Sequence, residues 1–202
     1  MSHKPEQTDR PEFGLTFPEQ EAAFVKKLYP EASVILEYGS GGSTVLAAEC
    51  GKPCLSVESD ALWAKMLTER LHESFDGSPT AKVFHVDIGP TRDWGYPQSS
   101  TNWEDYWKYP LSVWDSPGFQ QPDLVLIDGR MRTACFAAAM LKVQKETTVL
   151  FDDYKNRIHY HDVERYAQPD LFVGRMAKFT LRPHLLSMDV FADIVPWFFS
   201  VR

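Results

Sequence analysis

Short apolar runs alternate with longer amphipathic stretches along most of this chain. Five of the runs have the length and the aliphatic content of buried strands, and they cover residues 34–37, 53–57, 81–86, 123–127 and 147–151. Between them, hydrophobic positions recur at helical spacing over residues 60–75 and 133–145. Strands that alternate with helices are typical of a parallel sheet. The pattern therefore predicts an α/β fold that is doubly wound, with helices on both faces of the sheet.

The segments before the first predicted strand and after the fifth complete this prediction. Near the start, Thr16 to Glu19 has the spacing of a capping box and predicts a helix that stops before Pro30. In the 60–75 helix, we expect Leu62, Met66 and Leu71 to face the sheet. After a helix near residues 161–166, the segments 171–173 and 177–181 predict an antiparallel hairpin. The expected sheet thus has seven strands and is mostly parallel.

The first strand ends in an acid and a tight cluster of three glycines. The segment reads Glu37-Tyr38-Gly39-Ser40-Gly41-Gly42-Ser43, and Thr44 follows it. Glycine lets the backbone approach a ligand closely, and a helix over 45–50, capped by Ser43 and Thr44, would aim its free N–H groups at the turn. The turn therefore indicates a nucleotide-type ligand, although a glycine turn without a ligand remains the alternative.

The spacing of the glycines separates two kinds of site. Dinucleotide folds use G-x-G-x-x-G to hold a pyrophosphate, but here the third position is Thr44 and Glu37 would be a poor neighbour for that group. The segment instead resembles the E/D-x-G-x-G-x-G motif of class I S-adenosylmethionine-dependent methyltransferases, with Ser43 in place of the last glycine. The resemblance covers residues 34–181 and implies a Rossmann-like fold that binds S-adenosylmethionine along Glu37, Tyr38, Gly39, Ser40, Gly41 and Ser43.

Acidic residues follow all five predicted parallel strands. Glu58 lies 19 residues beyond Gly39. In both the dinucleotide-binding and the methyltransferase fold, a carboxylate at this position can accept hydrogen bonds from the two ribose hydroxyls. The family resemblance implies that Asp87 lies near the adenine amino group and that Ile88 covers the ring. Because ligands bind at the carboxyl ends of parallel strands, we expect these acids and Asp128 to meet in one crevice. The alternative for each acid alone is a turn or a helix cap.

Asp128 is the candidate catalytic residue. We expect it beside the transferred methyl group, where it either orients the acceptor or helps to hold a metal. Catechol-type methyltransferases hold a divalent cation at similar positions, so Asp128, Asp152 and Asp153 form a possible but unfavoured metal site, because the expected amide and lysine are missing. His159 and His161 could supply a base, or could simply face solvent.

Residues 91–119 interrupt the alternation with an irregular aromatic segment. It contains Trp94, Trp103, Trp107 and Trp114 among prolines and serines. Long irregular segments often form lids or binding loops. We expect Trp94, Trp103 and Trp107 to wall a pocket for a flat or apolar acceptor, while a hydrophobic cluster or a homodimer interface are the alternatives.

Composition narrows the class of protein. The 202 residues suit a single domain, here 1–202 with a polar tail at 1–15. A net charge of -7 without a cluster of Lys and Arg argues against a nucleic-acid partner, and three cysteines are too few for a disulfide framework. The sequence contains no apolar stretch long enough to span a membrane, so we expect no membrane partner and a cytoplasmic protein.

These observations predict a methyltransferase that transfers a methyl group to O or N of a small molecule. Two rival hypotheses remain. One is an NAD-dependent oxidoreductase on a similar sheet, which Glu37 and the missing third glycine disfavour. The other is a protein that binds S-adenosylmethionine without turnover, because no known acceptor motif follows the fourth strand.

Overall fold

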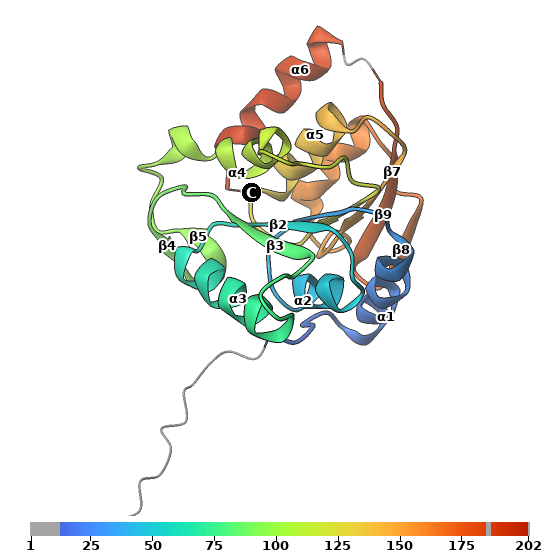
Figure 1. The fold of residues 1–202 in the computed structure, drawn as a ribbon. Helices are drawn as coiled ribbons and strands as arrows, with labels where there is room; N and C mark the ends of the chain where they lie inside the picture. Colours follow the sequence, from blue (N-terminus) through green and yellow to red (C-terminus); the bar gives the residue numbers. More distant parts are fainter. Residues whose placement is uncertain (1–12, 185–186, 202) are drawn as a thin grey trace, which may run out of the picture.

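The computed structural model describes residues 13–184 and 187–201, and one mixed sheet forms its centre (Figure 1). The sheet has seven strands in the order β3-β2-β1-β6-β7-β9-β8, and a separate two-stranded sheet pairs β4 with β5. The strands are β1 Ile35–Tyr38, β2 Cys54–Glu58, β3 Ala81–His85, β4 Thr91–Arg92, β5 Tyr96–Pro97, β6 Leu124–Ile127, β7 Thr147–Phe151, β8 Leu171–Val173 and β9 Met176–Leu181. The α/β fold class predicted from the sequence is confirmed.

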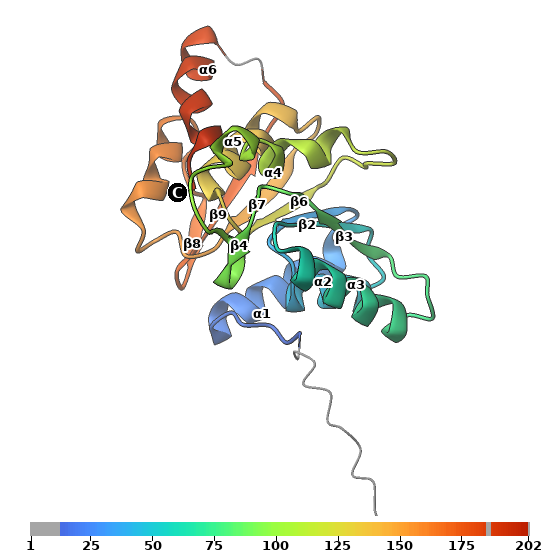
Figure 2. The same cartoon turned by 90° about the vertical axis from the view of Figure 1, so that its left-hand side faces the viewer.

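Helices cover both faces of this sheet, as the views in Figures 1 and 2 show. The helices are α1 Glu19–Leu28, α2 Gly42–Glu49, α3 Ala61–Ser74, α4 Lys108–Leu111, α5 Arg132–Lys142 and α6 Met188–Ile194, and the short 3-10 helices are η1 Tyr29–Glu31, η2 Asp93–Gly95, η3 Trp103–Asp105, η4 Ser112–Asp115, η5 Ile158–Arg165 and η6 Val195–Phe199. Helices α1, α2 and α3 lie on one face, and α4, α5 and α6 lie on the other.

The pleat of each central strand divides its side chains between two hydrophobic cores. In β1, Leu36 and Tyr38 pack with the α5 side, whereas Ile35 packs with Val25 of α1 and Leu67 of α3. All four residues of β1 and of β6 are buried. A parallel strand covered on both faces needs such a continuous apolar run, which is why the sequence predicted these strands well.

The predicted hairpin is also present. Strand β7 pairs with β9 in antiparallel fashion, and β9 pairs with β8 in the same way. Gly174 makes the turn between β8 and β9 with φ +56°. A Cβ there would meet the carboxylate of Glu21, which accepts a hydrogen bond from the Arg175 N–H at 2.7 Å. Helix α1 is thus fastened to the edge of the sheet.

Three details of the predicted helices are wrong. Helix α1 begins after Pro18, which makes no side-chain cap, so the capping box expected at Thr16 does not form. Helix α2 begins at Gly42, and Ser43 and Thr44 lie inside its first turn instead of capping it from outside.

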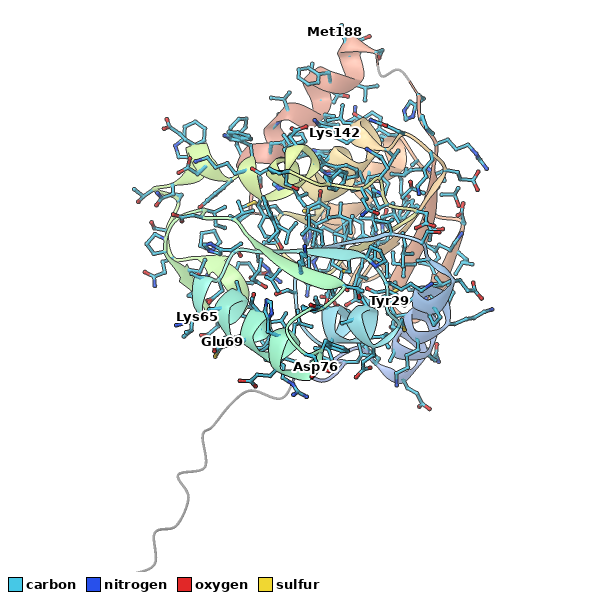
Figure 3. The ribbon with its side chains drawn as sticks, in the orientation of Figure 1. Tyr29, Lys65, Glu69, Asp76, Lys142 and Met188 are labelled. Carbon is cyan, nitrogen blue, oxygen red and sulfur yellow. The ribbon has the colours of Figure 1, made fainter. Side chains whose placement is uncertain are left out.

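The third error concerns the buried face of α3. Leu62 is 66% exposed, whereas Ala64, Leu67 and Leu71 are buried. Their spacing of three and four residues defines one helical face, and Leu62 projects from the opposite side because it lies two residues from Ala64. Figure 3 labels two further residues of the exposed surface of this helix, Lys65 and Glu69.

The aromatic segment 91–119 divides into two parts. After Asn102 it forms η3, α4 and η4, and it buries Tyr106, Tyr109, Val113 and Trp114 in the core on the α5 side. Before Asn102 it forms the small β4–β5 sheet, which is more exposed. Within the described residues, no helix has both the length and the apolar content to cross a membrane.

Candidate active site

A cavity of about 580 Å³ opens at the carboxyl ends of β1, β2 and β6. Binding sites for small ligands commonly have this size. Its lining consists of Phe13, Gly14, Leu15, Thr16, Phe17, Gly39, Ser40, Gly41, Gly42, Ser43, Glu58, Ser59, Asp60, Trp63, Asp93, Trp94, Gly95, Tyr109, Asp128, Gly129 and Arg130. Strands β1 and β6 are neighbours whose connections run in opposite directions along the sheet, which is where open α/β sheets bind ligands.

The glycine turn after β1 brings two strand ends into contact. Gly39 has φ +95°, and a Cβ on it would lie 2.7 Å from the Cα of Gly129 after β6. A Cβ on Gly129 would in turn lie 2.1 Å from the Tyr109 hydroxyl. Only glycine fits both positions, so the turn can pack against the end of β6 and leave its backbone open to the cavity. Of the predicted turn residues, Gly39, Ser40, Gly41 and Ser43 line the cavity.

Glu37 and Tyr38 directly precede this turn, and hydrogen bonds of their side chains fix its position. The Glu37 carboxylate is fully buried and accepts hydrogen bonds from the Tyr29 hydroxyl at 2.7 Å and from Thr44 Oγ1 at 2.6 Å. Burial raises the pKa of Glu37, while these two bonds oppose the rise. The Tyr38 hydroxyl accepts from Trp114 Nε1 at 2.7 Å. Neither side chain lines the cavity, so the contact that we predicted with a bound cofactor stays a prediction.

Glu58 lies at the cavity wall and is almost fully buried, and its predicted contact with a ribose stays a prediction. Its Oε1 accepts from the backbone N–H groups of Ser59 and Asp60 at 2.7 and 3.0 Å, and its Oε2 accepts from Ser40 Oγ at 2.8 Å. The first two bonds fix the carboxylate, and the third joins it to the glycine turn. Trp63 adds to this wall, because its Nε1 donates to the Ser40 carbonyl at 2.9 Å.

Asp87 and Ile88 do not reach the lining of this cavity. The Asp87 carboxylate is exposed and accepts from the Gly89 N–H at 2.8 Å, while Ile88 is fully buried in the core on the α5 side. Their predicted place beside an adenine ring is therefore untested.

Asp128 lies at the cavity beside a network of arginines and acids. Arg132 Nη2 is 3.1 Å from Asp128 Oδ1, and the same guanidinium donates to the backbone carbonyls of Gly129 and Asp152. Burial raises the pKa of the Asp128 carboxyl to about 7, with Arg132 opposing the rise and Asp152 and Asp153 adding to it. A carboxylate with this pKa can exchange a proton near neutral pH.

The possible metal site at Asp128, Asp152 and Asp153 is not formed. Arg175 pairs with Asp152 at 2.8 Å and with Asp153 at 3.0 Å, and Arg132 bridges Asp128 and Asp153. Guanidinium groups therefore occupy the positions that a cation would take. Across residues 13–184 and 187–201, no group of three His, Cys, Asp or Glu side chains is arranged to hold a metal ion.

The other sequence candidates have mixed outcomes. Trp94 lines the cavity and is 82% exposed, whereas Trp103 and Trp107 lie outside the lining, and Trp103 packs on Phe199 instead. His161 stacks on Tyr154 away from the cavity.

Several cavity residues were missed by the sequence reasoning. Residues 13–17 cross over the glycine turn, so that a Cβ on Gly42 would lie 2.2 Å from the Gly14 carbonyl oxygen. Phe13 also packs edge-on against Trp63. Phe13 and Phe17 were the signal in the sequence that could have revealed this contact, because a polar tail that packs against nothing would rarely contain two aromatic side chains so close together.

No protein-family model matches the chain, and no curated protein matches it significantly. Among solved structures, a methyltransferase-like protein from Silicibacter pomeroyi is 42% identical with a TM-score of 0.86, and the match covers 94% of this chain and 98% of that one.

Two more distant structures share the fold alone. An RNA methyltransferase from Salinibacter ruber in complex with S-adenosyl-L-homocysteine is 13% identical, has a TM-score of 0.51, and matches over 87% of this chain and 98% of its own. A SAM-dependent O-methyltransferase from Thermotoga maritima is 9% identical, has a TM-score of 0.52, and matches over 86% of this chain and 69% of its own. With the near-complete match at 42% identity, the chain belongs to the methyltransferase-like proteins, and its fold is that of the class I S-adenosylmethionine-dependent methyltransferases.

Proposed function

We propose that this protein binds S-adenosylmethionine in the cavity and transfers its methyl group to an oxygen or nitrogen of a small-molecule acceptor. The observation that carries the proposal is one cavity with the glycine turn and Glu58 at one side and Asp128 at the end of the neighbouring strand. When bound, S-adenosylmethionine supplies a methyl group on a positively charged sulfonium. The chain's own residues have to bind the cofactor and the acceptor, orient them toward each other and exclude water from the site.

The glycine turn and β2 support the cofactor half of the site. The open backbone at Gly39 and Gly41 allows close approach of a flat, polar ligand, and a Cβ on Gly41 would meet only Trp63, at 4.0 Å. Glu58 Oε2 can exchange its bond with Ser40 Oγ for a ribose hydroxyl, while Oε1 stays fixed by two backbone N–H groups. We propose that Glu37 also positions this turn, because its carboxylate accepts a hydrogen bond from Thr44 Oγ1 in the first turn of α2.

Asp128 supports the acceptor half. With a pKa of about 7, its carboxylate can accept the proton that the attacking hydroxyl or amine loses as the methyl group is transferred. Arg132 restricts the carboxylate by pairing with Oδ1, and that guanidinium is itself held by three backbone carbonyls. Asp128 is thus oriented before an acceptor arrives, which is the main contribution an enzyme makes to such a displacement.

The turn between β4 and β5 supports a lid that is shorter than the 91–119 segment predicted from the sequence. Trp94 and Gly95 both have positive φ, and Ser59 Oγ donates to the Gly95 carbonyl at 3.0 Å. We propose that this turn, with Trp94 at its tip, covers the acceptor side, while the part of 91–119 after Asn102 is fixed core.

The cofactor assignment is tested by a thermal-shift screen of S-adenosylmethionine, S-adenosylhomocysteine, NAD and NADP. A ligand at 100 times its Kd stabilises the protein by roughly 2.7 kcal/mol. We expect stabilisation by the first two compounds only, and stabilisation by NAD would favour the oxidoreductase.

Catalysis is then tested by S-adenosylhomocysteine release with a panel of small phenols, alcohols and amines. Turnover of one acceptor supports the enzyme. Cofactor binding with no turnover of any acceptor would favour a binding protein that keeps the pocket without the reaction.

A further inference from the structure

Resting on the proposed function, we propose that the methyl acceptor is a small molecule with an anionic group, a carboxylate or a phosphate, that binds to Arg130. This residue comes directly after Gly129 at the end of β6 and two positions after Asp128. Its side chain lines the cavity. It is the single cationic side chain among the described residues of that lining.

Within the described residues, Arg130 differs from the neighbouring arginines because its side chain has no hydrogen-bond or ion-pair partner. Arg132, Arg157 and Arg175 each form an ion pair with at least one aspartate. For the Arg130 side chain, the described residues provide no hydrogen bond or ion pair, and its buried Nε is an unsatisfied donor. A buried donor without an acceptor is costly, and such groups are rare in native proteins, so this one calls for an explanation, which a bound anion would supply.

The Tyr96 ring holds Arg130 at the cavity. The guanidinium carbon lies 4.0 Å from the ring centroid, and Tyr96 belongs to the β4–β5 sheet that carries Trp94. Stacking on an aromatic face restricts a guanidinium but leaves its N–H groups available, and their fork matches a carboxylate or a phosphate. The side chain is therefore preorganised to receive an anion.

Among the described residues, no carboxylate forms an ion pair with Arg130. The carboxylates of Asp128, Asp152 and Asp153 are already engaged by other arginines, so they do not neutralise Arg130 by direct pairing. An anionic group bound to Arg130 would hold the acceptor at the end of β6, two residues from Asp128.

The test uses isothermal titration with three probes that differ in one substituent: 4-hydroxybenzoate, 4-hydroxyphenyl phosphate and the neutral 4-hydroxybenzamide. Each is titrated into the full chain saturated with S-adenosylhomocysteine. We expect at least one anionic probe to bind at least about tenfold more tightly than the amide, the scale of a hydrogen bond to a charged group. The tighter of the two anions identifies the substituent.

Variants assign the effect to Arg130. Arg130→Gln should reduce the preference for the anion to less than about twofold. Arg92→Gln is the matched control, because Arg92 lies 5.7 Å from the same Tyr96 ring but does not line the cavity, and it should keep the preference. Equal affinity of the wild type for all three probes, or a preference that survives in Arg130→Gln, would overturn the proposal.

Titration of S-adenosylhomocysteine alone separates this proposal from the proposed function. If the wild type does not bind it, the proposed function fails and the acceptor assignment fails with it. If the wild type binds it but Arg130→Gln binds it at least about tenfold more weakly, Arg130 is a cofactor contact and only the acceptor assignment is wrong. Equal affinity in the two proteins is the result that we expect.

Discussion

At the scale of residues, Asp128 carries the chemical prediction. It lies at the cavity, where burial raises the pKa of its carboxyl to about 7 and Arg132 pairs with its Oδ1. A carboxylate with this pKa can serve as a general base near neutral pH.

Asp128→Asn should lower kcat by about 100-fold or more, because general-base catalysis typically contributes a factor of 10² to 10⁴. The wild-type rate should also depend on pH. The base works only when ionised, so kcat/KM should fall about tenfold per pH unit below a pKa of about 7 and level off above it. Asn removes that dependence. A pH profile of methyl transfer for both proteins is the measurement, with the thermal midpoint as a control for folding, and the same profile in both would contradict the assignment.

The sequence identified the strand-end acids and the glycines of this site but not the residues that meet them from other elements. Glu58 and Asp128 were predictable because they follow buried strands, whose ends converge in a parallel sheet. Tyr109 and Arg130 were not, because their place at the cavity depends on how α4 and β5 pack against the end of β6.

At the scale of elements, continuous apolar runs predicted the strands, whereas helix starts and the aromatic segment depended on tertiary contacts. Thr44 was expected to precede α2, but it is the third residue of that helix. From there its hydroxyl accepts a hydrogen bond from the Gly41 N–H at 3.1 Å. The segment 91–119 has no periodicity that distinguishes its buried tyrosines from its exposed tryptophans, although Tyr106 and Tyr109 are core and Trp94 is at the cavity.

Two glycines of this segment give a matched test of the β4–β5 turn. Gly95 and Gly118 have similar φ, +69° and +75°, so alanine at either should cost about 1 to 2 kcal/mol of unfolding free energy through left-handed strain. A Cβ on Gly95 would lie 2.7 Å from Ser59 Oγ and 3.3 Å from Glu58 Oε1, whereas a Cβ on Gly118 meets nothing within 4 Å.

Gly95→Ala should therefore weaken binding of S-adenosylhomocysteine several-fold by displacing the turn from Glu58, and Gly118→Ala should leave it unchanged. Urea unfolding and calorimetric titration of both variants provide the comparison. Equal binding by the two would mean that the turn does not support the cofactor wall.

At the scale of the whole molecule, one sheet is shared by two hydrophobic cores. Leu36 and Ile35 are adjacent in β1 yet belong to different cores, so neither core can be lost while the other keeps its central strand. The alternation of apolar runs and helical stretches made the sheet and its helices predictable, whereas the single domain over 1–202 stays a prediction. The part that sequence could not supply is the return of residues 13–17 to the glycine turn, because nothing local fixes that long-range contact.

This architecture predicts a single cooperative unfolding transition in urea. Tryptophan fluorescence reports mainly on the segment that contains Trp94, Trp103, Trp107 and Trp114, whereas far-ultraviolet circular dichroism reports on the helices and the sheet. The two signals should give the same midpoint and slope. Separate transitions would show that the aromatic segment or one face unfolds independently.

The most direct test of the central claim is calorimetric titration of S-adenosylhomocysteine into the wild type, Glu58→Gln and Glu69→Gln. The last is the control, because Glu69 lies on the exposed surface of α3 (Figure 3). We predict one binding site per chain, with affinity about 10- to 150-fold weaker in Glu58→Gln, which corresponds to roughly 1.5 to 3 kcal/mol for a bond to a charged group, and unchanged in Glu69→Gln. No binding by the wild type, or wild-type affinity in Glu58→Gln, would contradict the account.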